Sequence, residues 1–134
     1  MSHMTTVNTE IRDVKALSQA AKALGLELLK GGQARGYDNR LYEEADYLIK
    51  LPGTLDLGFR KQADGTYSFE CDNGLMYGMF GSTEGYNIIG EKANRLKIEY
   101  SFAVLQANAR KRGRRIQREE LPNGSVRVVI SGGR

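Results

Sequence analysis

The sequence predicts an α+β fold, a single domain in which a mostly antiparallel sheet packs on one long and one short helix. The chain has 134 residues, of which 40% are hydrophobic and 27% charged, a length and composition typical of one soluble domain. Several short segments alternate apolar and polar residues, as strands do, with no long helix between them. One longer segment repeats apolar residues at helical spacing. We therefore expect one α+β domain over residues 1–134.

The first third of the chain is predicted to hold a strand, the short helix and a second strand. Alternating residues from Thr5 to Ile11 include several β-branched side chains, which favour a strand. Asp13 can cap a helix over residues 14–24, and Gly25 can end it. Residues 26–30 form a short apolar run that predicts the second strand. Residues 31–44 have no clear period, so we predict a surface loop there.

The middle of the chain predicts three more strands. Residues 45–51 form one strand, which the Pro52-Gly53 turn ends. Residues 55–59 and 67–71 alternate around a turn at 63–65 and predict an antiparallel hairpin with one apolar face. That face carries Phe59, Tyr67 and Phe69, and we interpret it as sheet core rather than as a platform on which nucleic-acid bases stack.

The last third predicts the long helix and a final hairpin. One apolar stripe with spacings of three and four runs through residues 87–112, which indicates a continuous helix packed on the sheet. The stripe consists of Ile89, Ala93, Leu96, Tyr100, Ala103 and Ala107. Gly113 ends the helix. Residues 114–131 predict a hairpin around Pro122-Asn123-Gly124, with Val126, Val128 and Ile130 on its inner face.

The composition excludes several kinds of active site. The chain has one histidine, His3, and one cysteine, Cys71, so it has no internal disulfide, Cys/His zinc site or iron–sulfur cluster. His3 lies beside the N-terminus, and Cys71 is in phase with the apolar Phe69, which predicts a buried thiol. We expect no catalytic residue, no metal and no cofactor; a small enzyme that uses Asp, Glu, Tyr, Arg and Lys is the least favoured alternative.

A basic segment is the strongest candidate for a binding site. Six cations and no acid fall within nine residues: Arg110, Lys111, Arg112, Arg114, Arg115 and Arg118. Because the net charge is +4, the remaining residues sum to −2 once these six are set aside. The segment predicts contacts with an anionic partner, either nucleic acid or an acidic protein. The alternative is structural, because cations at the end of a helix complement its macrodipole.

Two other segments are candidate partner-binding sites. The stretch Leu75 to Phe80 would form an apolar docking patch if exposed, which suggests a subunit or adaptor of a larger assembly. Its candidate contact residues are Met76, Met79 and Phe80. Tyr37 and Tyr42 lie in the predicted loop and are further candidates for partner contact. No segment approaches the roughly 18 apolar residues of a membrane-spanning helix, so we expect no membrane partner.

The order of several short motifs resembles a known family. They are Met1-Ser2-His3, Leu24-Gly25, Leu55-Asp56-Leu57-Gly58-Phe59, Asp64-Gly65-Thr66-Tyr67, Tyr100 with Val104, Gly113 and Asn123-Gly124. Together they resemble the uncharacterised "hypothetical chloroplast reading frame thirty-five" family of plastids, cyanobacteria, other bacteria and phages. The resemblance implies a native N-terminus and a bacterial cytoplasm or plastid stroma, and it carries over no catalytic residue. Arg114-Arg115 departs from the family pattern, so a function built on it belongs to this member.

Overall fold

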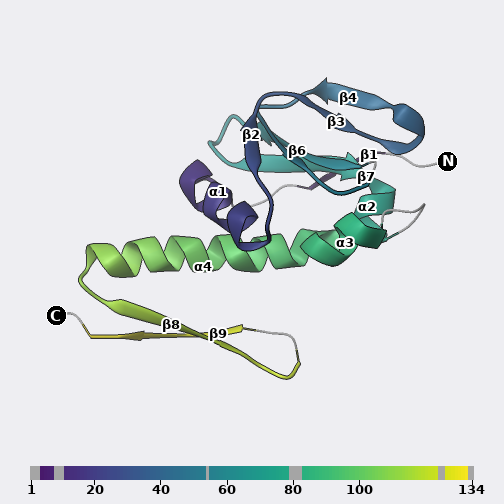
Figure 1. Ribbon diagram of the computed structural model, residues 1–134. Coiled ribbons are helices and arrows are strands. Elements are labelled where there is room, and N and C mark those ends of the chain that lie inside the picture. Colours follow the sequence, from purple (N-terminus) through teal and green to yellow (C-terminus); the bar gives the residue numbers. More distant parts are fainter. Residues whose placement is uncertain (1–3, 8–10, 54, 79–82, 124–125, 133–134) are drawn as a thin grey trace.

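The computed structural model describes residues 4–7, 11–53, 55–78, 83–123 and 126–132. It has four layers: a two-stranded ribbon, a five-stranded sheet, the main helices and a second two-stranded hairpin (Figure 1). The elements are β1 (Met4–Val7), α1 (Val14–Ala23), β2 (Leu28–Lys30), β3 (Gln33–Arg35), η1 (Tyr37–Asn39), β4 (Leu41–Glu44), β5 (Tyr47–Lys50), β6 (Asp56–Lys61), β7 (Tyr67–Asp72), α2 (Asn73–Tyr77), α3 (Thr83–Ile89), η2 (Glu91–Ala93), α4 (Asn94–Lys111), β8 (Arg115–Glu120) and β9 (Val126–Ser131). The predicted α+β class is confirmed.

The five-stranded sheet has the order β1-β7-β6-β5-β2, and all its pairs are antiparallel. Phe59 of β6 lies opposite Phe69 of β7, with the ring centroids 6.3 Å apart. Both side chains are fully buried under the helices, so the interpretation of this face as core is confirmed. Residues 8–10, which belong to the predicted first strand, lie outside the described residues.

The short helix α1 has the predicted ends. The Asp13 carboxylate accepts the backbone N–H of Lys15 at 2.9 Å and that of Ala16 at 3.2 Å, which caps the first turn. Gly25 ends the helix with a φ of 76°. The Tyr100 hydroxyl of α4 accepts the backbone N–H groups of Arg12 and Asp13 at 2.9 and 3.0 Å, so the start of α1 is tied to the long helix.

The prediction of one continuous helix over residues 87–112 is wrong. The helix is interrupted between α3 and α4, because Gly90, Lys92 and Ala93 have φ values of 81°, 52° and 58° in the left-handed region. A side chain at Gly90 would also collide with the Asn94 carboxamide. Ile89 and Ala93 nevertheless remain buried, so the apolar stripe correctly marked the core face although the backbone is broken.

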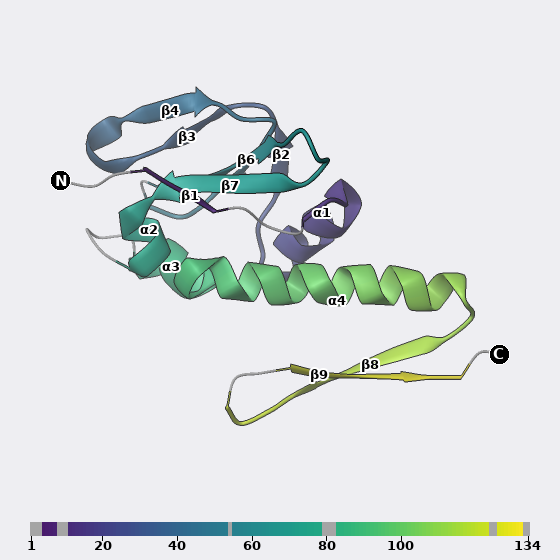
Figure 2. The same ribbon diagram turned by 180° about the vertical axis from the view of Figure 1, so that it is seen from behind.

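The prediction of a loop over residues 31–44 is also wrong. β3 and β4 pair as an antiparallel ribbon that covers the second face of the sheet (Figures 1 and 2). The ribbon approaches closely at Gly58, where an added Cβ would lie 3.3 Å from the Cβ of Ala45 and 3.7 Å from that of Ala34. Both alanines are buried, so the sheet is covered on both faces.

The final hairpin is confirmed, and it is separate from the five-stranded sheet. β8 and β9 pair antiparallel and lie along α4, on the opposite side of that helix from the sheet (Figures 1 and 2). Val126 and Val128 are half-buried, whereas Ile130 on the same face is 46% exposed. The predicted inner face is therefore covered along only part of its length.

Candidate anion-binding site

Five of the six predicted cations lie together where α4 turns into β8. Arg110 and Lys111 occupy the last turn of α4, Arg112 is its C-cap, Arg114 follows the turn, and Arg115 opens β8. All five are exposed. We call these five residues the basic junction.

The helix end fixes the backbone of the basic junction. Gly113 has a φ of 66°, which a glycine adopts without strain. Its N–H donates to the Arg110 carbonyl at 3.1 Å, and the Arg114 N–H donates to the buried Ala109 carbonyl at 2.8 Å. These two bonds form a Schellman motif. The cations therefore surround a defined turn.

The described part of the chain does not neutralise the basic junction. None of its five side chains makes an ion pair with a residue in the part of the chain that the structure describes. The acids that follow it are engaged elsewhere: Glu119 pairs with Arg127 at 2.6 Å, and Glu120 lies 3.6 Å from Arg118. The five charges are free to face an external anion.

Arg118, the sixth predicted cation, has a different role. Its guanidinium donates to both carboxylate oxygens of Glu99 on α4, at 2.6 and 2.5 Å, and lies 5.2 Å from the centre of the Phe102 ring. The side chains of Arg118 and Glu99 are only 23% and 13% exposed. The hydrogen bonds to Glu99 raise the pKa of Arg118 above its ordinary value. Arg118 holds β8 against α4, so we do not include it among the candidate anion-binding residues.

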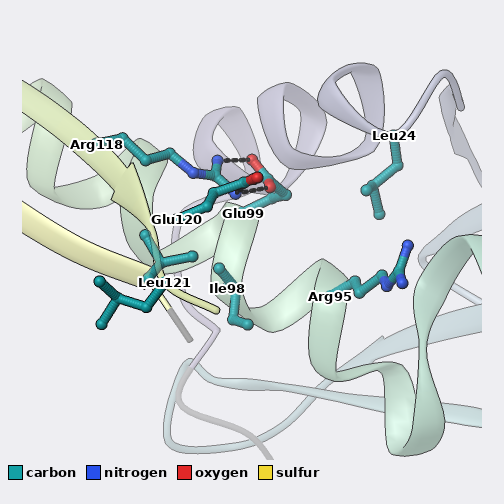
Figure 3. A pocket seen from close by; sticks show the side chains of 8 residues that line it. Leu24, Arg95, Ile98, Glu99, Arg118, Glu120 and Leu121 are labelled. Atoms are coloured by element: carbon teal, nitrogen blue, oxygen red, sulfur yellow. Dashed lines mark hydrogen bonds and ion pairs between the residues drawn. The ribbon is translucent and has the colours of Figure 1, made fainter. Parts of the chain in front are cut away.

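A cavity of about 370 Å³ surrounds this ion pair, between α4, the end of α1 and the hairpin (Figure 3). Arg118 and Glu99 are hydrogen-bonded to each other in its lining, with Glu120 beside them and Arg95 further along α4 (Figure 3). The described residues of its lining include two arginines and two glutamates. This balance of charge gives the cavity no preference for an anion, unlike the basic junction.

The apolar stretch at residues 75–80 does not form the predicted docking patch in its described part. Leu75 and Met76 are each 1% exposed, because α2 turns them into the core, so the expectation of an exposed Met76 is wrong. The Asp72 carboxylate caps α2 by accepting the Gly74 N–H at 2.9 Å. Met79 and Phe80 lie outside the described residues.

The two loop tyrosines occupy different environments. Tyr37 lies in η1 and is 46% exposed, so its ring stays a candidate for partner contact. Tyr42 is half-buried, and its hydroxyl donates to the buried Asp72 carboxylate at 3.1 Å. Burial first, and then the Asp72 charge, raise the pKa of Tyr42 to about 12. Tyr42 therefore holds the β3–β4 ribbon on the sheet.

Replacing Tyr42 by phenylalanine is expected to lower the free energy of unfolding by about 1.5 kcal/mol at pH 7, because a hydrogen bond to a buried carboxylate is lost. The raised pKa favours the neutral phenol in the folded state, so its contribution is complete below pH 10 and is lost as the pH rises towards 12. The difference between wild type and Y42F should therefore shrink over this range. Urea unfolding at pH 7, 10 and 12 measures it.

Tyr77→Phe is the control, because Tyr77 is 46% exposed. It is expected to change stability by less than about 0.5 kcal/mol at each pH. A Y42F variant that matches Y77F would contradict the assigned role of the Tyr42 hydroxyl.

The carboxylate of Asp56 is buried, and no sequence pattern predicted this. Its Oδ2 accepts the backbone N–H and Nε of Arg35 at 2.9 and 2.8 Å, and its Oδ1 accepts Nη2 of Arg35 and the Leu51 N–H at 2.8 and 3.2 Å. Arg35 lies in the segment predicted as a loop, so the Arg35–Asp56 ion pair was not predicted. Four donors fill the lone-pair sites of the carboxylate, so Asp56 has a structural role.

The remaining candidates for a nucleophile or a metal ligand form no site among the described residues. Cys71 is fully buried, as predicted, and burial together with the Asp72 charge raises the pKa of its thiol to about 12. His3 lies outside the described residues. Among the residues described, no three His, Cys, Asp or Glu side chains are grouped to hold a metal ion. The same residues contain no helix long and apolar enough to cross a membrane.

Comparisons with known proteins give a family for the chain. Residues 20–129 match the family model described as "Protein of unknown function (DUF1257)". The chain is 28% identical to the "Uncharacterized protein ycf35" of Cyanophora paradoxa over 131 residues, which cover 97% of this chain and 96% of that protein. No solved structure matches. The resemblance drawn from the sequence motifs is confirmed, and the chain belongs to the DUF1257 family of proteins of unknown function.

Proposed function

We propose that this protein is a non-enzymatic binding module that engages the phosphate backbone of a nucleic acid through the basic junction. The observation that carries the proposal is the set of five exposed cations around one fixed helix end, with no ion pair to them among the described residues. Arginine and lysine side chains placed in this way neutralise phosphates and release their counterions. We place this binding in a bacterial cytoplasm or a plastid stroma, the compartments that the family resemblance implies.

The charge at the basic junction exceeds what the helix end requires. The macrodipole presents the equivalent of about half a negative charge at a helix C-terminus. Five unit charges of opposite sign therefore leave a net positive surface there. This excess favours the anion-binding proposal over a purely structural role.

The five-stranded sheet favours contacts with phosphate over stacking with bases. The aromatic residues of the sheet, Phe59, Tyr67 and Phe69, are buried and offer no stacking platform. Binding through the basic junction alone would be independent of sequence and strongly dependent on salt.

The test is fluorescence anisotropy with labelled duplex DNA, single-stranded DNA and RNA over a range of salt concentrations. For duplex DNA we expect log K against log[salt] to have a slope of about −3 to −4.5, because each neutralised phosphate contributes about −0.9. An acidic peptide serves as the competing ligand. Tighter binding of that peptide than of any nucleic acid would replace the proposed partner with an acidic protein.

A charge-reversal variant assigns the binding to the basic junction. Arg112, Arg114 and Arg115 changed together to Glu should weaken binding at low salt by at least about 30-fold and make the salt slope shallower. Its control changes Lys30, Lys50 and Lys61 to Glu, which alters the net charge equally at exposed ends of sheet strands. Equal losses in the two variants, or no binding by the wild type at low salt, would overturn the proposal.

A further inference from the structure

The outer edge of β9 has no partner strand among the described residues. Within the described residues β9 pairs only with β8, and this hairpin joins neither of the other sheets. A strand edge without a partner strand is a template for another strand. We propose that β9 pairs antiparallel with β9 of a second copy of this chain, which joins two hairpins into one four-stranded sheet.

An apolar groove lies beside this edge. It has a volume of about 440 Å³ and runs between α4, which supplies Ile98, Phe102 and Leu105, and β9, which supplies Val126 and Val128. Among the described residues neither a carboxylate nor a residue of β8 lines it, and its one charged lining residue is Lys97. The groove is therefore on the β9 side of the hairpin, where an added strand would place its inward-facing side chains.

The apolar residues around this edge are incompletely covered. Leu105, Val129 and Ile130 are 39%, 45% and 46% exposed. Ile130 shares the inner face of the hairpin with its cross-strand partner Ile116, and Val129 lies on the outer face. Each copy thus supplies both an apolar groove and apolar side chains that suit it, which is the self-complementarity of an isologous interface.

Charge favours a second copy and favours β9 over β8. Arg127 is the one charged residue of β9, and it is paired with Glu119 at 2.6 Å. Two β9 strands can therefore meet without opposing unpaired charges, whereas β8 carries two arginines and two glutamates. With Val129 opposite its own counterpart, Val128 of each copy lies opposite Ile130 of the other.

The rest of the molecule leaves room for this pairing. The helix α1 lies on the side of α4 that faces the five-stranded sheet, opposite the hairpin, so it lies away from the β9 edge (Figures 1 and 2). Strands about 4.8 Å apart would place the two α4 helices about 10 Å apart, which is a normal distance for packed helices. Because the strands run antiparallel, the two basic junctions lie at opposite ends of the new sheet and do not repel each other closely.

The test measures the mass of the full chain by light scattering and sedimentation over a wide concentration range. We expect a dimer of twice the 14.9 kDa chain mass. Val129→Lys should raise the dimer dissociation constant by about 100-fold, because the twofold axis repeats the substitution in one interface. Gln117→Lys is the matched control, because Gln117 is the cross-strand partner of Val129. The substitution adds the same charge on β8, away from the outer edge of β9.

A second variant separates loss of pairing from loss of the hairpin. Leu105→Lys changes the groove wall on α4 and leaves the β8–β9 ladder intact, and it should also favour the monomer. A wild type that stays monomeric at all concentrations would overturn the proposal. A dimer that resists both V129K and L105K, or that Q117K weakens equally, would overturn it as well. None of these outcomes depends on the nucleic-acid binding proposed above.

Discussion

Asp56→Asn is expected to lower the free energy of unfolding by about 3 kcal/mol. The substitution keeps the shape of a fully buried side chain but replaces one carboxylate oxygen by an amide group. In the place of Oδ2 that amide nitrogen would face the backbone N–H and Nε of Arg35, and in the place of Oδ1 it would face Nη2 of Arg35 and the Leu51 N–H, so two donors lose their acceptor in either orientation. The expected loss is at the low end for a buried ion pair, because the Arg35 side chain is 39% exposed and water can solvate it.

The control for D56N is Asp46→Asn. Asp46 is exposed, and its side chain accepts one backbone N–H, from Lys61 at 2.7 Å, which an asparagine carbonyl can still accept. We expect a loss below about 1 kcal/mol, and urea denaturation measures both variants. Equal losses in D56N and D46N would show that the Asp56–Arg35 pair does not hold the β3–β4 ribbon on the sheet.

The Asp56–Arg35 pair also shows where sequence patterns stop being informative. The β6–β7 hairpin was predictable, because six-residue strands with one apolar face show a clear alternation. β3 has only three residues, which is too short for such a pattern. Its position depends on a carboxylate 21 residues away in the chain, a distance at which local patterns carry no information.

The helical spacing of the apolar residues predicted which side chains are buried, but it did not predict that the helix is interrupted. Ile89, Ala93 and Leu96 were predicted to face the core, and all three do. The interruption between α3 and α4 depends on left-handed backbone at Gly90, Lys92 and Ala93. Only the glycine favours that conformation locally, so tertiary packing must impose it on the other two residues.

The sequence predicted which cations form the candidate site, but not that Arg118 is separate from the other five. A cluster of like charges is visible in any sequence, and five of the six cations do lie exposed at one helix end. Arg118 lies on β8 and Glu99 lies on α4, with the turn at the end of α4 between them in the sequence. No local sequence pattern therefore predicts that they pair. Met76 was misplaced for a related reason, because the five-residue helix α2 that buries it is too short to show a period.

Glu99→Gln is expected to loosen the β8–β9 hairpin without unfolding the five-stranded sheet. The change removes the charge that holds the Arg118 guanidinium, in a pair only 13% and 23% exposed. The expected cost is about 2 kcal/mol in the local opening of the hairpin, which corresponds to amide exchange about 30-fold faster in β8 and β9. Hydrogen exchange followed by NMR measures each strand separately, and amides of β6 and β7 should keep their protection.

Glu119→Gln provides the comparison within the same hairpin. The Arg127–Glu119 distance of 2.6 Å is as short as the Arg118–Glu99 bonds, but the two side chains are 59% and 53% exposed. Solvent screening should limit its effect to less than about 0.5 kcal/mol, so exchange would change by about twofold at most. Similar exchange in E99Q and E119Q would mean that the hairpin stays on α4 through its apolar contacts alone. The expected difference between the variants follows from burial, because the two pairs have nearly equal hydrogen-bond lengths.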